Sequence, residues 1–564
     1  MSRWLASLVF LGTLAFLGAF LVWPVVQVVQ GGFVDEGGHF TLGHLGAVLA
    51  NPLYREGLLN SFLLACATTV LAFALGLPLA YCADRYRFPG KAVLTALILV
   101  PVVLPPFVGA IGLRQIFGQY GALNALLQHA SLLAPGATVD WLAHGRFWGI
   151  ALVEALNLYP IIFLNAVAAL ANVDPAMEEA AANFGCTGWR RFRRITLPLI
   201  RPGLFAGGTI VFIWSFTELG VPLVFDYDRL TSVQIFALLK ELSGNPAPYA
   251  LVALLLVSSA VLYAVGRGLF GGTGHAMMAR ATSASSARWL PWWQSVPVAL
   301  LFATVLLFAV LPHVGVVLVA SSRDWYATVF PAQYTLENFR LALGHDLTVS
   351  AIGNSLRYAA LATLLDLVLG VAIAWVVVRS RLPGRKLLDG LIMLPLAVPG
   401  LVLAFGYLAM TREGRFFAAL DPVENPTVLL VIAYAVRRLP YVVRAAAAGL
   451  QQTNVALEEA AQNLGATAAR ALRRITLPLI AANLIAGALL AFAFAMLEVS
   501  DSIILAQKAA YFPITKAIYE LYQLLGDGRY LAAALGTWAM AFLALTIVAL
   551  GVLLGKKAGA LFRG

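Results

Sequence analysis

The chain alternates long apolar stretches with short polar segments from end to end. A helix needs roughly 20 apolar residues to cross the hydrocarbon core of a membrane, and about twelve stretches reach that length. Strands of a membrane barrel would be about 10 residues long and would alternate in polarity, which these stretches do not. The pattern therefore predicts an all-α polytopic membrane protein. The predicted spans are 7–29, 57–83, 92–117, 147–170, 199–220, 248–270, 293–319, 350–378, 388–411, 427–449, 479–500 and 531–555.

Composition supports this class. Hydrophobic residues make up 61% of the 564 positions and charged residues only 12%, which excludes a soluble globular domain. The first apolar stretch is long and lacks a clear small-x-small cleavage site, which favours a membrane helix over a removed signal peptide. The three cysteines form neither a disulfide framework nor a metal-ligand spacing.

The net charge of +11 is sorted by side of the membrane. If the N-terminus is inside, the inner loops hold more Lys and Arg than Asp and Glu, and the outer loops show the reverse. This asymmetry predicts that both termini are cytoplasmic. Because it accounts for the basic charge, we expect no nucleic-acid partner.

The chain contains an internal repeat. Residues 178–204 and 458–484 are identical at 17 of 27 positions without a gap, at an offset of 280. Asn60 and Pro101 recur at an offset of 294, as Asn354 and Pro395. Each half then has six spans, and an even number predicts parallel repeats related by an axis along the membrane normal. The predicted division is a first repeat at 1–270, a cytoplasmic linker at 271–292 and a second repeat at 293–564.

The repeated segment has the signals of a short capped helix in a cytoplasmic loop. Asp174 suits an N-cap, and Pro175 suits the first helical position. Glu178 and Glu179 follow near the positive end of the helix dipole. Gly185 is placed to end the helix in a left-handed conformation. Since the same design occurs twice, we expect an external partner with two equivalent sockets.

Both loops resemble the EAA loop of permease subunits of bacterial binding-protein-dependent ABC importers, in their Glu-Ala-Ala, Gly and Ile-x-Leu-Pro positions. The resemblance implies two fused type I (MetI-like) repeats in the bacterial inner membrane, closest to the ferric-iron branch. It also implies that coupling loops 174–198 and 454–478 dock on two copies of an ATPase subunit. The implied ATPase-coupling residues are Glu178, Glu179, Ala180, Gly185, Glu458, Glu459, Ala460 and Gly465.

The resemblance implies further partners, since such importers receive solute from a periplasmic or lipid-anchored binding protein. The sequence contains no G-x-x-x-x-G-K-[ST] phosphate-binding loop, so ATP and Mg are expected on the partner subunits. We also find no grouping of residues that favours catalysis. The chain is therefore predicted to be a permease without its own catalytic site, cofactor or firm metal site.

Ionisable residues inside spans are costly and usually functional. Glu218 and Glu498 share the offset of 280, and Asp501 follows closely. These three carboxylates form a candidate path for a cationic substrate. The alternative is that each glutamate caps a re-entrant turn or pairs with a nearby cation.

A second set of polar residues differs between the halves. Glu154 and Asn157 lie mid-span in the first half, and the second half has Arg437 where the first has Asn157, followed by Arg438. We expect Glu154 to pair with one of these arginines, so that the four residues form a gate or charge filter. The alternative is a static ion pair that holds the halves together.

The substrate most favoured by the resemblance is ferric iron, because acidic residues near Glu218 and at Glu498 are similar to that branch. Thiamine, a phosphonate such as 2-aminoethylphosphonate, or another small solute are alternatives by the same mechanism. An ion-coupled secondary transporter is a remote alternative, since it would not need two matching cytoplasmic loops.

Overall fold

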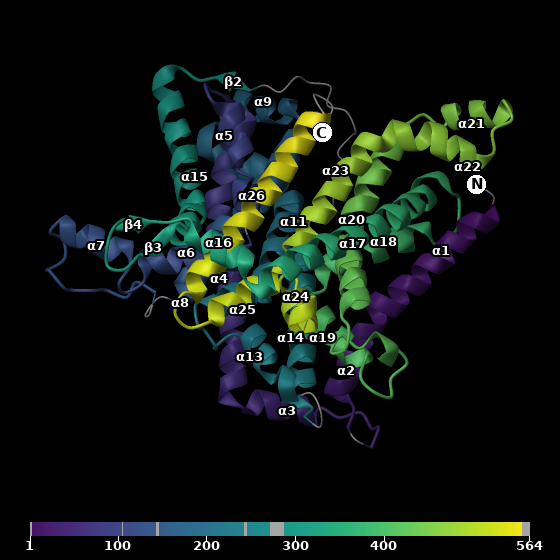
Figure 1. Cartoon of the computed structure of the whole chain (residues 1–564). Helices are drawn as coiled ribbons and strands as arrows, with labels where there is room; N and C mark the ends of the chain where they lie inside the picture. The colour runs from purple at the N-terminus through teal and green to yellow at the C-terminus, as the bar shows by residue number, and fades with distance from the viewer. Residues whose placement is uncertain are drawn as a thin grey trace. The chain divides into compact units, whose positions relative to one another are not determined.

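The structure is a computed structural model, and it describes residues 3–35, 37–103, 105–142, 146–241, 245–270 and 287–554. It is built almost wholly of helices (Figure 1), which confirms the predicted fold class. Most of the predicted linker, residues 271–286, lies outside the described residues. Two short strand pairs join loops: β1 (Tyr86–Arg87) with β2 (Arg288–Trp289), and β3 (Ser322–Asp324) with β4 (Gln333–Tyr334).

The helices follow the predicted spans closely. Those up to the linker are α1 (Arg3–Leu17), π-turn η1 (Gly18–Val22), α2 (Trp23–Phe33), α3 (Gly43–Ala50), α4 (Pro52–Arg85), α5 (Lys91–Leu97), η2 (Val100–Val103), α6 (Pro106–Phe117), α7 (Ala122–His129), α8 (Arg146–Ala171), α9 (Pro175–Asn183), α10 (Gly188–Arg191), π-turn η3 (Phe192–Thr196), α11 (Leu197–Phe216), α12 (Gly220–Val224), α13 (Thr231–Ala237), η4 (Leu238–Glu241) and α14 (Ala247–Phe270).

The helices after the linker repeat this order. They are α15 (Trp292–Ala320), α16 (Glu337–Gly344), α17 (Asp346–Arg379), α18 (Arg385–Ala397), α19 (Gly400–Met410), η5 (Ala418–Leu420), α20 (Thr427–Gln452), α21 (Ala456–Asn463), α22 (Ala468–Ala471), π-turn η6 (Leu472–Thr476), α23 (Leu477–Met496), α24 (Ser500–Leu505), η7 (Ala509–Tyr511), α25 (Ile514–Gln523) and α26 (Gly528–Leu554).

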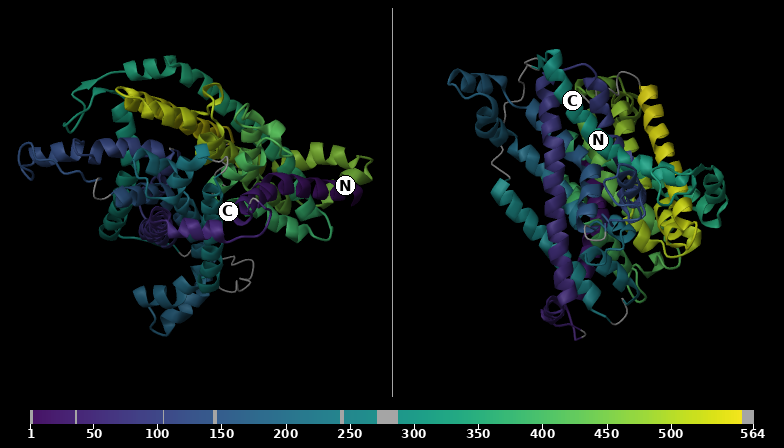
Figure 2. Two further views of the ribbon diagram at one scale, coloured as in Figure 1. Left: turned by 90° about the horizontal axis from the view of Figure 1, so that it is seen from below. Right: turned by 90° about the vertical axis from the view of Figure 1, so that its left-hand side faces the viewer.

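Equivalent helices have equal lengths, which agrees with duplication. α4 and α17 each have 34 residues, α8 and α20 each have 26, and α11 and α23 each have 20. In Figure 2, right, α4 is the long violet helix that runs uninterrupted despite an internal proline, Pro78. Within the described residues, nine helices are long and apolar enough to span a membrane, and a bent pair makes a tenth.

Two predicted spans are wrong in detail, because each is broken by proline. Span 92–117 consists of α5, η2 and α6, with Pro105 as the N-cap of α6. Span 388–411 consists of α18 and α19, which bend by 98° before Pro399 caps α19. Proline has no backbone N–H and restricts the residue before it, so the ladder of hydrogen bonds stops there. The predicted span 427–449 lies within α20, which is helical throughout but carries three arginines.

The described residues divide into two compact units. Unit 1 comprises Met1–Leu45, Glu241–Ala253 and Phe339–Gly564, and unit 2 comprises Gly46–Lys240 and Leu254–Asn338. In unit 2, α4 packs against α8 and α11, and their buried residues form one cluster with Phe302 of α15. In unit 1, α17 packs against α20 and α23.

The first helices of the two repeats are exchanged between these units. α15, which begins the second repeat, packs in unit 2 against α6, where a Cβ on Gly112 would lie 2.5 Å from the nitrogen of Val316. α2 of the first repeat packs in unit 1 against α19, where a Cβ on Gly406 would lie 2.6 Å from the carbonyl oxygen of Pro24. Only glycine permits these close helix contacts. The predicted repeats and the packing units therefore divide the chain differently.

Candidate functional site

The coupling loops contain the two short helices that the sequence predicts. Asp174 Oδ1 accepts a hydrogen bond of 2.9 Å from the backbone N–H of Ala176 at the start of α9. Asn454 Oδ1 accepts one of 3.0 Å from Ala456 at the start of α21. These caps satisfy backbone donors that the first turn leaves free.

Glycine ends both coupling helices in a left-handed conformation. Gly185 has a φ of +75° and Gly465 a φ of +88°. A side chain on either would meet nothing within 4 Å, so the backbone conformation is the reason for glycine there. The predicted local structure of the loops is thus confirmed.

The two adjacent glutamates of each coupling helix lie in different environments. Glu178 is buried, and its Oε1 lies 2.6 Å from Arg85 Nη2 and accepts a 2.7 Å hydrogen bond from Thr196 Oγ1. Glu179 is exposed. In the second copy Glu458 is half-buried near Arg379, and Glu459 is exposed. The first glutamate of each pair therefore holds the helix to its own unit, and the second is accessible to a partner.

Each coupling loop also presents large apolar side chains at equivalent positions. Phe184 is 91% exposed and Leu464 is 90% exposed, 280 positions apart. Met177 and Leu457 are about half-exposed. Ala180 and Ala460 are exposed between these two pairs of positions. An exposed apolar set at the tip of a capped helix is typical of a docking surface.

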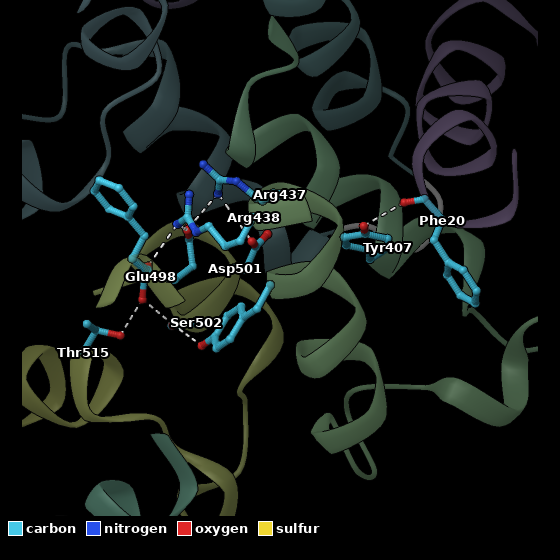
Figure 3. Close-up of polar contacts among 10 residues, drawn as sticks. Phe20, Tyr407, Arg437, Arg438, Glu498, Asp501, Ser502 and Thr515 are labelled. Carbon is cyan, nitrogen blue, oxygen red and sulfur yellow. Dashed lines mark hydrogen bonds and ion pairs between the residues drawn. The ribbon is translucent and has the colours of Figure 1, made fainter. Parts of the chain in front are cut away.

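A cluster of charged side chains lies in unit 1 between α20 and the turn that joins α23 to α24 (Figure 3). Arg437 Nη1 lies 2.6 Å from Glu498 Oε1 and 3.3 Å from Asp501 Oδ2. Arg438 binds the other oxygen of Glu498 and donates a 3.1 Å hydrogen bond to the carbonyl of Phe494. Each arginine thus has a carboxylate partner, which is the arrangement that makes buried charge tolerable.

Backbone and hydroxyl contacts fix the turn that carries Glu498. Thr515 Oγ1 donates a 2.7 Å hydrogen bond to the carbonyl of Glu498, and Ser502 Oγ donates to the same oxygen (Figure 3). The hydroxyls of Tyr434 and Ser502 are 2.7 Å apart. Elsewhere in the same view, Tyr407 donates a 2.7 Å hydrogen bond to the carbonyl of Phe20.

Gly400 makes room for one of the two arginines. A Cβ there would lie 2.2 Å from Arg437 Nη1, so the guanidinium rests on the bare backbone at the start of α19. The interruption of the helix between α18 and α19, together with this glycine, makes the space that Arg437 occupies.

The equivalent region of unit 2 has no matching arginines. Glu154 is 1% exposed, and its Oε2 accepts a 3.2 Å hydrogen bond from Thr68 Oγ1 and another from Ser215 Oγ. The predicted pairing of Glu154 with Arg437 or Arg438 would join the two units, and it stays a prediction. All three side chains have partners within their own units, and no signal in the sequence identified the two hydroxyls that bind Glu154.

Glu218 caps a turn, which is one of the two alternatives to a role in the substrate path. Its Oε1 accepts hydrogen bonds of 3.0 Å from Gly220 and 3.3 Å from Val221, so it caps α12 after the end of α11. Glu498 follows the other alternative, since it pairs with cations, and Asp501 belongs to the same group. A role of these carboxylates in the substrate path stays a prediction.

Asn157 stabilises the broken span beside it. Its Nδ2 donates a 2.7 Å hydrogen bond to the carbonyl of Pro101, a carbonyl freed where the helix stops. With His313 and four prolines it lines a small cavity in unit 2, the prolines being Pro101, Pro105, Pro106 and Pro312. A gating role for Asn157 stays a prediction.

Sequence reasoning missed several residues of these sites. Asp366 of α17 is fully buried, neither of its carboxylate oxygens has a hydrogen-bond partner in the described structure, and Arg438 acts on it electrostatically. Asp366 could have been found from the sequence, because it is an acidic residue within a predicted span. Arg85 and Arg379 could also have been found, because they lie 294 positions apart at equivalent ends of two predicted spans.

Comparison with known proteins adds a family and several relatives. Residues 72–270 and 366–556, more than half of the chain, match the profile of the family described as binding-protein-dependent transport system inner membrane component. A relative from Haemophilus influenzae, named putative ferric transport system permease protein FbpB 1, is 28% identical over 504 residues. That match covers 86% of this chain and 76% of the relative.

Two further relatives differ in how much of the chain they match. The ferric transport system permease protein FbpB of Actinobacillus pleuropneumoniae is 26% identical and covers 86% of this chain and 69% of its own length. The sulfate transport system permease protein CysT of Escherichia coli is 30% identical, over 38% of this chain and 76% of its own length. The relatives named for ferric transport therefore match across both repeats.

Proposed function

The chain belongs to the family of binding-protein-dependent transport system inner membrane components, and from that premise we propose that the solute it imports is ferric iron. As a permease of an ATP-driven importer, it forms a translocation path and couples to separate subunits. The observation that carries the proposal is the extent of similarity: the relatives named for ferric transport match 86% of the chain, across both repeats.

The charge cluster of unit 1 supports the same substrate. Two unpaired arginines in the membrane would attract an anion and repel a ferric ion. Arg437 and Arg438 are instead paired with Glu498 and Asp501. Asp366, in the same unit, adds a buried carboxyl group without a salt bridge among the described residues. A region whose arginines are neutralised and whose further ionisable groups are acidic favours a cationic solute over sulfate.

The experiment is uptake by the complete importer: this chain, its ATPase subunits and its binding protein in lipid vesicles. We expect ATP-dependent uptake of radiolabelled ferric iron that excess sulfate, thiamine or 2-aminoethylphosphonate does not reduce. Uptake of one of those solutes, with none of ferric iron, would contradict the proposal. A proton or sodium gradient without ATP should drive no uptake, and uptake on the gradient alone would indicate a secondary transporter.

We further propose that coupling loops 174–198 and 454–478 face the cytoplasm and dock on two copies of the ATPase subunit. Support comes from their duplication, from exposed Phe184 and Leu464, and from the basic residues of the loops predicted to be inside. Both termini are then cytoplasmic, and ATP and Mg are bound by the partners. A periplasmic or lipid-anchored binding protein delivers solute on the other side. The chain itself then has no ATPase site.

The number of ATPase subunits can be measured directly. Mass determination of the purified, detergent-solubilised complex should give two ATPase chains for each copy of this chain. A single ATPase chain per copy would contradict the docking of both loops. Protease added to sealed inside-out vesicles should cleave the coupling loops, and cleavage only in right-side-out vesicles would contradict the orientation.

A further inference from the structure

Each coupling helix is tied to a long membrane helix by one arginine. Arg85 is the last residue of α4, and its Nη2 lies 2.6 Å from Glu178 Oε1, with the two side chains 14% and 6% exposed. Arg379 is the last residue of α17, and its Nε lies 3.5 Å from Glu458 Oε1, with the two side chains 9% and 12% exposed. Buried pairs of this kind resist separation far more than exposed ones, because each charge would be left without a partner.

These two contacts occupy equivalent positions in the repeats. Arg85 and Arg379 are 294 positions apart, the offset of the helices that carry them, and Glu178 and Glu458 are 280 positions apart. Within the described residues, these are the salt bridges that involve the coupling helices. This contact is present in both copies, although other charged residues within the spans differ between them. We therefore expect it to serve a step that both copies perform.

We call the contact of Arg85 with Glu178 the first clamp and the contact of Arg379 with Glu458 the second clamp, and the two differ in how many groups bind the glutamate. In unit 2 the hydroxyl of Thr196, at the end of π-turn η3, also binds Glu178, at 2.7 Å. In unit 1 the equivalent Thr476 ends η6 and is buried, but its hydroxyl has no hydrogen-bond partner among the described residues. Arg379 Nη2 donates instead to the carbonyl of Thr453, at 2.8 Å. The first clamp is therefore closed around Glu178, and the second is open.

The clamped helices lead from the coupling loops to the buried ionisable residues. Thr68 lies 17 residues before Arg85 in α4, or about 26 Å along a helix, and binds Glu154. Asp366 lies 13 residues before Arg379 in α17, or about 20 Å. A helix that moves as one piece carries a displacement at its end to these residues.

We propose that Arg85 and Arg379 are positioning residues of the transport cycle, which make α4 and α17 follow the coupling helices. The closed clamp on Glu178 transmits this movement more tightly than the open clamp on Glu458. The proposal rests on the proposed docking of the ATPase on the coupling loops. It adds the step from that docking to the interior of the membrane units.

The test measures transport and ATP hydrolysis together in the complete importer. Arg85→Ala should keep the ATPase subunits bound and hydrolysing ATP, while solute imported per ATP falls about tenfold, within the usual range of coupling between sites. Arg379→Ala should reduce it less, because the contact that it removes is longer. Arg87→Ala and Arg381→Ala are matched controls, each an exposed arginine two residues further on, and should change nothing.

Two milder variants keep the test valid if an alanine variant fails to fold. Thr196→Val keeps the shape of the side chain but removes the hydrogen bond to Glu178, and it should lower solute per ATP severalfold. Thr476→Val removes a hydroxyl without a partner and should have no effect. The double variant Arg85→Glu with Glu178→Arg reverses the pair and should recover most of what Arg85→Ala loses.

The outcomes separate this proposal from the one on which it rests. Failure of the unchanged chain to retain the ATPase subunits would overturn the docking of the coupling loops. Retained subunits with unchanged solute per ATP in Arg85→Ala and Thr196→Val would overturn the positioning role alone. Equal effects of Thr196→Val and Thr476→Val would overturn the difference between the clamps.

Discussion

Arg437 Nη1 and Glu498 Oε1 lie 2.6 Å apart in a charge cluster where neither residue is more than 15% exposed in its side chain. Glu498 also binds Arg438, so one carboxylate neutralises two neighbouring cations of α20. Removal of this carboxylate therefore affects two guanidinium groups at once.

Glu498→Gln should strongly destabilise the protein. The amide keeps the size of the side chain but leaves Arg438 without a carboxylate partner, and breaking a buried pair costs about 3–5 kcal/mol. Thermal unfolding of the detergent-solubilised chain measures the effect. Glu56→Gln, which breaks an exposed pair with Arg229, is the control and should leave the unfolding temperature almost unchanged. Equal stability of the two variants would show that the cluster is not needed for folding.

Gly400→Ala should displace Arg437. The new Cβ would lie 2.2 Å from Nη1, and overpacking of this kind costs about 1–3 kcal/mol. Gly390→Ala on the neighbouring helix α18 is a matched control, since its Cβ would meet nothing within 4 Å. Thermal unfolding of both variants checks the difference. A Gly400→Ala protein as stable as Gly390→Ala would contradict the packing of Arg437 on α19.

Phe184→Ser combined with Leu464→Ser should prevent association with the ATPase. Both side chains are at least 90% exposed in this chain, so the substitutions leave its own packing intact. Loss of a central apolar anchor costs about 2 kcal/mol or more at an interface, well over tenfold in affinity for each site. Co-purification of the ATPase subunits is the measurement. Leu132→Ser, exposed outside the coupling loops, is the control and should keep the complex intact.

Gly185→Ala and Gly465→Ala should loosen the ends of the coupling helices. Their positive φ costs a residue with a side chain about 1–2 kcal/mol, although the Cβ itself has space. We expect faster hydrogen exchange in residues 175–190 and 456–470, with the membrane helices unaffected. Unchanged exchange in these loops would show that the left-handed conformation does not control where the helices end.

Much of the architecture was predictable because it depends on local pattern. Apolar length predicted the spans, and the offset of 280 predicted that α9 and α21 are equivalent. Asp174 and Gly185 predicted where α9 begins and ends. Each of these signals acts within a few residues of the chain or compares the chain with itself, so no knowledge of distant contacts was required.

The failures concern breaks and partners. Apolar length alone predicted 92–117 as one helix, although Pro105 and Pro106 stop it in the middle. Charge alone suggested a cation for Glu154 and could not predict that the hydroxyls of Thr68 and Ser215 bind it within unit 2. A hydroxyl partner cannot be singled out from sequence, because serine and threonine occur throughout these helices and packing decides which of them faces the carboxylate.

The exchange of α15 and of α1–α2 between the packing units has a consequence for how the chain can be divided. A cut between the repeats would yield two polypeptides, each missing a helix from its own bundle and carrying one that belongs to the other. Neither fragment should fold fully alone, whereas the two synthesised together should assemble. Because both repeats are one polypeptide, each bundle is synthesised together with the helix that it receives from the other repeat, in equal number.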